Sequence, residues 1–159
     1  MTEDVLFREI PADAPAAVEL VGGYYTELAG RFPAGFDVDA YTRGAPAAEP
    51  GRFVLATRAG VPVACGVLRP LGDGIGEIKR MWVDPDVRGL GLGRRLLGHL
   101  EGLAVRDGYR AIRLDTNGSL TEAIGLYTRA GYHRIPRYND NPYADLWFEK
   151  RLDGGAQPD

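Results

Sequence analysis

Three glycines at alternate positions open the segment Gly89-Leu90-Gly91-Leu92-Gly93, and a regular apolar pattern follows them. Leucines recur three or four residues apart at positions 92, 96, 100 and 103, which is the spacing of one buried helix face. A helix is therefore predicted to begin within the glycines. The first turn of a helix leaves backbone N–H groups unpaired at the positive end of its dipole, and glycine lets an anion approach them. The pattern predicts a phosphate-binding glycine cradle (residues 89–93), to which Arg88, Arg94 and Arg95 add positive charge.

Two common phosphate motifs do not fit the glycine cradle. A dinucleotide fingerprint needs a third glycine where Arg94 stands, and a P-loop needs a terminal G-K-[ST], which the segment lacks. A glycine-rich turn between a strand and a helix, without any ligand, stays an alternative.

Length and composition limit the classes of protein. The 159 residues suit one domain, expected over residues 1–152, followed by a polar tail at 153–159 that is predicted to be disordered. The start of the chain is acidic and no apolar run is long enough for a membrane span, so we expect a cytoplasmic protein with no membrane partner. A net charge of -3 argues against nucleic acid binding. Positions 78–113 nevertheless hold eight basic and four acidic residues, which favours a small polyanionic ligand.

Cysteine and histidine are scarce. Cys65 is the single cysteine, so no intrachain disulfide forms, and His99 and His133 have no metal-ligand spacing; no metal is expected. Cys65 lies in an apolar strand pattern without a nearby histidine. We interpret it as a small buried residue and not as a nucleophile.

Apolar alternation and turn residues predict the order of elements. Strands are expected at 5–10, 52–58, 61–68, 76–83, 109–116, 132–137 and 145–152, with a helical region after residue 11 and helices over about 92–106 and 120–130. Ser119 and Glu122 have the spacing of a capping box at the start of the last helix, and Gly131 suits its end. Antiparallel strands followed by a β-α-β crossover predict an α/β (α+β) fold, with a mixed, mostly antiparallel sheet and helices on both faces.

The stretch Arg88-x-x-Gly91-x-Gly93 resembles the pyrophosphate-binding signature of the GNAT superfamily of acyl-CoA-dependent N-acyltransferases, in which Arg or Gln is followed by x-x-G-x-[GA]. Both flanks are similar to the family as well: residues 81–85 read Met-Trp-Val-Asp-Pro, and residues 123–132 look like its A-x-x-L-Y-x-x-x-G-[FY] pattern. The resemblance covers residues 4–152. It implies a GNAT-like fold with one parallel, splayed strand pair, and acetyl-CoA as the cosubstrate.

The resemblance also implies a set of cofactor contacts. The backbone of the strand before the cradle would pair with the pantetheine arm, and one of its N–H groups would face the thioester oxygen. Asn117 precedes Ala123 by six residues, where the family's Asn commonly precedes the helix alanine by three, so its role stays open. The implied cofactor-binding residues are Met81, Trp82, Val83, Arg88, Gly89, Leu90, Gly91, Leu92, Gly93, Arg94, Arg95 and Asn117.

Tyr127 occupies the position of the family's usual general acid. A phenol near the sulfur can protonate the departing thiolate of coenzyme A. The alternative is a core tyrosine on an amphipathic helix.

Glu77 stands eleven residues before Arg88, at the spacing of the general-base glutamate in the histone-acetylating branch of the family. Strand alternation predicts that its side chain shares a face with Lys79, Met81 and Val83. The alternative is a glutamate at a strand edge or strand start that pairs with Lys79 or Arg80, with ordered water as the base.

These features together predict an N-acetyltransferase in which a primary amine attacks acetyl-CoA directly in a ternary complex. The acceptor, either a small-molecule amine or a protein amino group, is expected to contact Asn139, Asp140 and Asn141, although the same residues suit an ordinary turn. An acyl-CoA-binding sensor or interaction module without turnover, and a module that holds another diphosphate, are the alternatives. A homodimer stays open.

Overall fold

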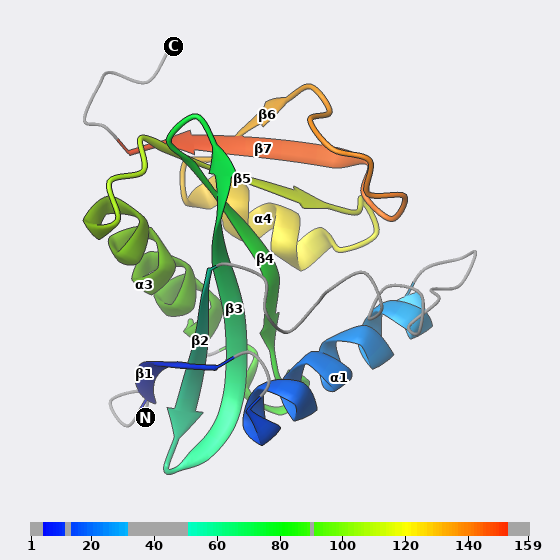
Figure 1. Ribbon diagram of the computed structural model, residues 1–159. Helices are drawn as coiled ribbons and strands as arrows, with labels where there is room; N and C mark the ends of the chain where they lie inside the picture. Colours follow the sequence, from blue (N-terminus) through cyan, green and yellow to red (C-terminus); the bar gives the residue numbers. More distant parts are fainter. Residues whose placement is uncertain (1–4, 12–13, 32–50, 90, 153–159) are drawn as a thin grey trace.

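The computed structural model describes residues 5–11, 14–31, 51–89 and 91–152 (Figure 1). Their elements are β1 (Val5–Ile10), α1 (Pro15–Arg31), β2 (Arg52–Arg58), β3 (Val61–Gly72), β4 (Ile75–Val83), a 3-10 turn η1 (Pro85–Val87), α3 (Leu92–Arg106), β5 (Ala111–Thr116), α4 (Thr121–Arg129), β6 (His133–Ile135) and β7 (Leu146–Arg151). The predicted order is confirmed, with β3 longer and β6 shorter than expected. Leu90 and the tail at 153–159 lie outside the described residues.

The described strands form one seven-stranded sheet in the order β1-β2-β3-β4-β5-β7-β6. Only β4 and β5 are parallel, and they pair over three positions, from Ile75 opposite Ala111 to Glu77 opposite Arg113. Beyond Glu77, β4 continues to Val83 beside β3 alone. The predicted mixed sheet with one splayed parallel pair is therefore confirmed. Among the described strands, none lies beside the second half of β4 on that side, so its backbone polar groups there have no strand partner in this part of the chain.

A β-bulge divides β4 into two halves. The register with β3 shifts in the middle of the strand, where Arg80 has a positive φ of 52°. One extra residue reverses the faces on which the following side chains lie. Met81 and Val83 consequently pack into the core beneath α3, whereas Trp82 packs into a second cluster beneath α1. The expectation that Glu77 shares a face with Met81 and Val83 is wrong, because the bulge lies between them.

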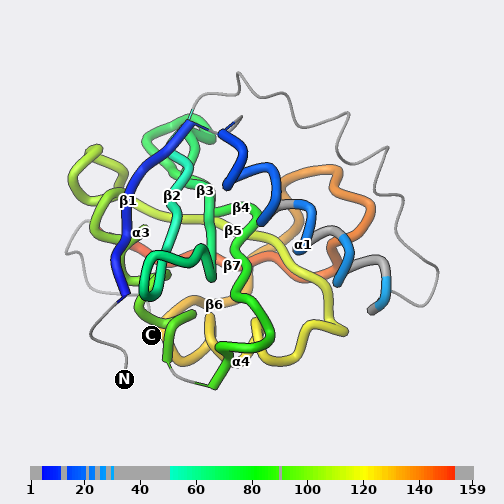
Figure 2. Tube along the Cα trace, turned by 90° about the horizontal axis from the view of Figure 1, so that it is seen from below, coloured from blue at the N-terminus to red at the C-terminus, as the bar shows by residue number. Residues whose placement is uncertain are grey.

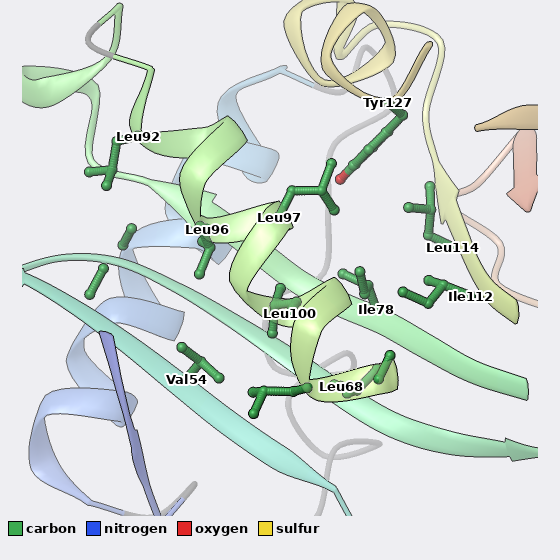
Figure 3. Close-up of a cluster of buried hydrophobic side chains, with 14 of the residues drawn as sticks. Val54, Leu68, Ile78, Leu92, Leu96, Leu97, Leu100, Ile112, Leu114 and Tyr127 are labelled. Carbon is green, nitrogen blue, oxygen red and sulfur yellow. The ribbon is translucent and has the colours of Figure 1, made fainter. Parts of the chain in front are cut away.

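Helices cover both faces of the sheet: α3 and α4 lie on one side and α1 on the other (Figures 1 and 2). The leucines predicted to form one face of α3 are all buried against the sheet (Figure 3). Burial of one leucine side chain contributes about 1.5 to 3 kcal/mol. This apolar face therefore fixes α3, and with it the glycine cradle, against β4.

The start of α4 differs from the prediction. Its N-cap is Leu120, which makes no side-chain capping bond. The Ser119 hydroxyl donates instead to Asn117 Oδ1 at 2.8 Å. The predicted capping box is wrong, because the serine is used in the turn that Asn117 forms. Gly131, with a φ of 97°, ends the helix as predicted.

Candidate active site

A cavity of about 390 Å³ lies between the splayed end of β4, the start of α3 and one face of α4. The predicted general acid, Tyr127, contributes to its wall from α4, and Glu27 contributes from α1. The cavity therefore brings together elements that are far apart in the sequence. The predicted cofactor-binding residues that line it are Met81, Trp82, Val83, Arg88, Gly89, Gly91, Leu92, Gly93 and Arg94.

The glycine cradle has the geometry that the sequence predicts. Gly91 is the N-cap of α3 and has a left-handed φ of 77°, and Gly89 has a φ of 85°. A Cβ added at either glycine would meet no atom within 4 Å. The backbone just before the first turn of α3 thus has a conformation that only glycine adopts readily. Open space lies beside these glycines, next to the unpaired N–H groups of that turn.

The positive charge of Arg88 is paired with a carboxylate from α1. Its Nη2 and Nη1 donate to Glu27 of α1 at 2.5 and 3.0 Å, and its Nε donates to the Val83 carbonyl at 2.9 Å. The guanidinium is therefore neutralised by a carboxylate and fixed to the end of β4. Glu27 was not predicted as a partner of Arg88, because 61 residues separate the two in the sequence.

The other predicted basic and amide contacts lie in different places. Arg94 lines the cavity, whereas the guanidinium of Arg95 lies over the Phe7 ring, 5.7 Å from its centroid. Asn117 donates through Nδ2 to the Tyr143 carbonyl at 2.8 Å. The structure does not bring Arg95 and Asn117 into the cavity wall. A further arginine, Arg129 on α4, does line the cavity and was not predicted.

Tyr127 is a largely buried residue in the part of the cavity wall that α4 forms. It is 7% exposed and packs against the rings of Tyr132 and Phe148, with centroids 5.9 and 6.3 Å away. Its side chain points from α4 towards Leu97 of α3 (Figure 3). Burial, and secondarily the charge of Asp115, raise the pKa of Tyr127 above its usual range, so the phenol keeps its proton at neutral pH. Both interpretations of Tyr127 are compatible with this position, since it is a core residue that also lines the cavity.

Glu77 lies in a buried polar cluster outside the cavity wall. The carboxylate is 0% exposed and accepts hydrogen bonds from Arg69 Nε at 2.8 Å and from the Tyr138 hydroxyl at 2.6 Å. Burial and the charge of Glu77 raise the pKa of Tyr138, which keeps that phenol as the donor. Glu77 is thus neither a strand-edge residue nor paired with Lys79. The polar cluster consists of Arg69, Glu77, Lys79, Asp115, Tyr138, Asn139 and Asn141.

Two of the three residues predicted to contact the acceptor amine belong to this polar cluster. Asn139 and Asn141 donate to the carboxylate of Asp115 at 2.5 and 3.2 Å, and Asn139 accepts from Trp147 Nε1 at 3.0 Å. Asp140 between them is exposed. The loop between β6 and β7 is therefore held to β5 by its amide side chains, and Asp140 alone of the three faces solvent.

The buried position of Glu77 leads to a stability prediction. Glu77→Gln removes the charge that pairs with Arg69 and replaces one of the two acceptor oxygens by an amide donor, which would face either Arg69 Nε or the Tyr138 hydroxyl. We therefore expect the free energy of unfolding to fall by about 1 to 3 kcal/mol. Chemical denaturation measures the change, with the exposed Glu19→Gln as the control. Unchanged stability together with a loss of turnover confined to low pH would instead support Glu77 as the base.

Other expectations concern residues away from the cavity. Cys65 is fully buried, and burial raises the pKa of its thiol to about 12, as expected of a small core residue. Among the described residues, no three His, Cys, Asp or Glu side chains group together as metal ligands would. None of the helices in this part of the chain is long and apolar enough to cross a membrane.

Comparison with known families addresses the signature directly. Residues 22–132 match the sequence profile of the acetyltransferase (GNAT) family. The chain belongs to the GNAT family. The matched range contains the glycine cradle, all of β4 and Tyr127, so the residues that carried the resemblance lie inside it.

Individual relatives are also acetyltransferases by name. This GNAT chain is 39% identical over 105 residues to an IAA acetyltransferase of Azospirillum brasilense, which covers 64% of this chain and 68% of that protein. It is 46% identical over 65 residues to a mycothiol acetyltransferase of Cellulomonas flavigena, covering 40% of this chain but only 18% of that protein. The alignments therefore support an acyltransferase and span only part of each relative.

Solved structures share the whole architecture of this GNAT chain. A GNAT-family acetyltransferase from Staphylococcus aureus has a TM-score of 0.77 at 19% identity and covers 93% of this chain and 99% of that one. A GNAT-family acetyltransferase from Elizabethkingia anophelis, with acetyl-CoA bound, has a TM-score of 0.68 at 20% identity. The match covers 94% of this chain and 99% of that one. At these identities the similarity shows the fold, and the predicted GNAT-like fold is confirmed.

Proposed function

We propose that this chain is an N-acetyltransferase that transfers the acetyl group of acetyl-CoA to a primary amine by direct attack in a ternary complex. One observation carries the proposal: an anion cradle, an unpaired strand edge and a buried phenol meet in a single cavity. These three features match the three chemical parts of an acyl-CoA, namely its diphosphate, its amide-bearing arm and its thioester.

Each part of the cosubstrate has a proposed partner. The N–H groups at Gly91 and the first turn of α3 bind the diphosphate. The second half of β4, with Met81, Trp82 and Val83, pairs with the pantetheine arm as an added strand would, and one of its N–H groups stabilises the oxyanion that develops on the thioester.

The transfer step needs two proton movements. The amine nitrogen forms a bond to the thioester carbon, the carbon–sulfur bond breaks, and Tyr127 gives its proton to the departing sulfur. The proton that the amine loses passes to water, because both carboxylate oxygens of Glu77 are bonded within the polar cluster. This assignment favours water over Glu77 as the base.

The acceptor is either a small-molecule amine or a protein amino group, with Asp140 as the exposed carboxylate that could attract its ammonium form. The competing proposal is an acyl-CoA-binding module of the same fold without turnover. Tyr127 favours the enzyme, since binding alone requires no proton donor beside the thioester.

The test has two stages. We first expect acetyl-CoA and coenzyme A, but not ATP or NAD, to raise the melting temperature, because a ligand that binds only the folded state stabilises it. A panel of small-molecule amines and peptides is then incubated with acetyl-CoA while release of the free thiol is followed. Binding of acetyl-CoA without thiol release from any amine would favour the non-catalytic module, and stabilisation by ATP or NAD alone would refute the acyl-CoA assignment.

A further inference from the structure

Glu27 of α1 holds two residues of the cavity wall at once. Its Oε1 accepts from Trp82 Nε1 at 3.0 Å and from Arg88 Nη2 at 2.5 Å, and its Oε2 accepts from Arg88 Nη1 at 3.0 Å. The carboxylate is therefore bidentate on the guanidinium and lines the cavity itself. None of these contacts follows from the family signature, which contains Arg88 but no residue of α1.

The Glu27 carboxylate occupies the side of Arg88 that a phosphate would use. A guanidinium recognises a carboxylate and a phosphate through the same pair of parallel N–H donors. The Nε of Arg88 is used as well, since it donates to the Val83 carbonyl at 2.9 Å. A diphosphate on the glycine cradle would therefore meet an arginine whose paired donors already hold an anion.

We propose that Glu27 competes with the cofactor diphosphate for Arg88, and that it yields the guanidinium when the diphosphate binds. The inference rests on the proposed function, which places a diphosphate on the glycine cradle. Two anions beside one cation repel each other, so the exchange relieves a repulsion that simultaneous binding would create. The Glu27 and Arg88 side chains are 20% and 33% exposed, and a partly exposed pair of this kind is weak enough to be exchanged.

The exchange also connects α1 to the cavity. Glu27 anchors the indole of Trp82, which lies in β4 between Met81 and Val83 and is proposed, together with them, to pair with the pantetheine arm. When Glu27 releases Arg88, it loses its ion pair and keeps the hydrogen bond from Trp82. Diphosphate binding is thereby linked to the position of α1 against β4. Glu27 is a positioning residue in this scheme and takes no part in acyl transfer.

The test compares Glu27→Gln with the parent by calorimetry, with coenzyme A and inorganic pyrophosphate as separate probes. Glutamine keeps an oxygen that accepts from Trp82 but loses the charge that pairs with Arg88. We expect about fivefold tighter binding of both probes, because the competing ion pair of a partly exposed couple is removed. The ligand-free variant should melt at a lower temperature than the parent.

Two controls identify the cause of the effect. Glu122 of α4 also lines the cavity, and Glu122→Gln removes one negative charge from the cavity wall, as Glu27→Gln does. We expect Glu122→Gln to alter the affinity less than twofold. In an Arg88→Gln background, Glu27→Gln should tighten binding by clearly less than it does when Arg88 is present, because only the direct repulsion between Glu27 and the diphosphate is then removed.

Besides unchanged affinity, three results would overturn the inference: weaker binding in Glu27→Gln, which would make Glu27 an orienting group for Arg88; an equal gain in Glu122→Gln; or a gain of the same size in the absence of Arg88. If the parent binds coenzyme A, and Glu27→Gln changes the affinity for neither coenzyme A nor pyrophosphate, this inference fails and the proposed function does not. If the parent does not bind coenzyme A, the proposed function fails, and the pyrophosphate arm still decides whether Glu27 competes at Arg88.

Discussion

Tyr127→Phe is expected to slow the chemical step by about 100-fold or more, because loss of a positioned general acid typically costs this much when departure of the leaving group limits the rate. Phenylalanine keeps the ring contacts with Tyr132 and Phe148, so stability and acetyl-CoA affinity should change little. The measurement is single-turnover kinetics with saturating acetyl-CoA, since slow product release could hide the effect in steady-state rates. Because burial raises the pKa of Tyr127, ionisation of this phenol should not reduce the parent's rate below about pH 10.

Tyr132→Phe is the matched control for this experiment. Tyr132 packs against Tyr127, but its hydroxyl donates to Glu101 at 2.8 Å and it does not line the cavity. Its loss should lower stability and leave the chemical step unchanged. An equal chemical step in Tyr127→Phe and in the parent would reduce Tyr127 to a packing residue and return protonation to water.

Gly91→Val is expected to weaken acetyl-CoA binding by at least about 100-fold. The φ of 77° at this position is strained for any residue with a Cβ, and most of all for a β-branched one. The added side chain would also fill the open space beside the first-turn N–H groups of α3. Two lost charge-assisted hydrogen bonds, at about 1.5 to 3 kcal/mol each, are enough for this effect. Calorimetry measures the affinity, and circular dichroism shows whether the variant is folded.

Gly102→Ala provides the matched control within the same helix. Gly102 lies inside α3, where an added Cβ meets no atom within 4 Å and alanine is the better helix former. This variant should bind acetyl-CoA like the parent and be slightly more stable. A folded Gly91→Val variant with the parent's affinity would remove the glycine cradle from the binding site.

Local patterns predicted the features that local physics controls. The start of α3 followed from the leucine spacing and the glycines, because both signals lie within one helix and its first turn. The splay of β4 from β5, and the place of Tyr127 beside it, came from the resemblance to the GNAT family. Composition and periodicity alone would not have predicted either.

Two contacts that the sequence did not predict join segments that are distant in the sequence. The pairing of Arg88 with Glu27 and that of Glu77 with Tyr138 each span 61 residues. No local pattern identifies such partners, so the partners of Glu77 and Arg88 in these pairs were not predicted. The Ser119 prediction failed for a local reason. The Asn117 side chain, two residues away, accepts from the Ser119 hydroxyl, and the spacing rule for a capping box takes no account of this acceptor.

The extra residue at Arg80 divides β4 into two short strand segments. Side chains that would share one face in a regular strand lie on opposite faces before and after it. The first half contributes Glu77 and Lys79 to the polar cluster, and the second half contributes Met81 and Val83 to the wall of the cavity. Substitutions in one half therefore need not disturb the other. For protein engineering, this independence means that the polar cluster can be redesigned by mutating the first half of β4 while the segment proposed to hold the cosubstrate is left intact.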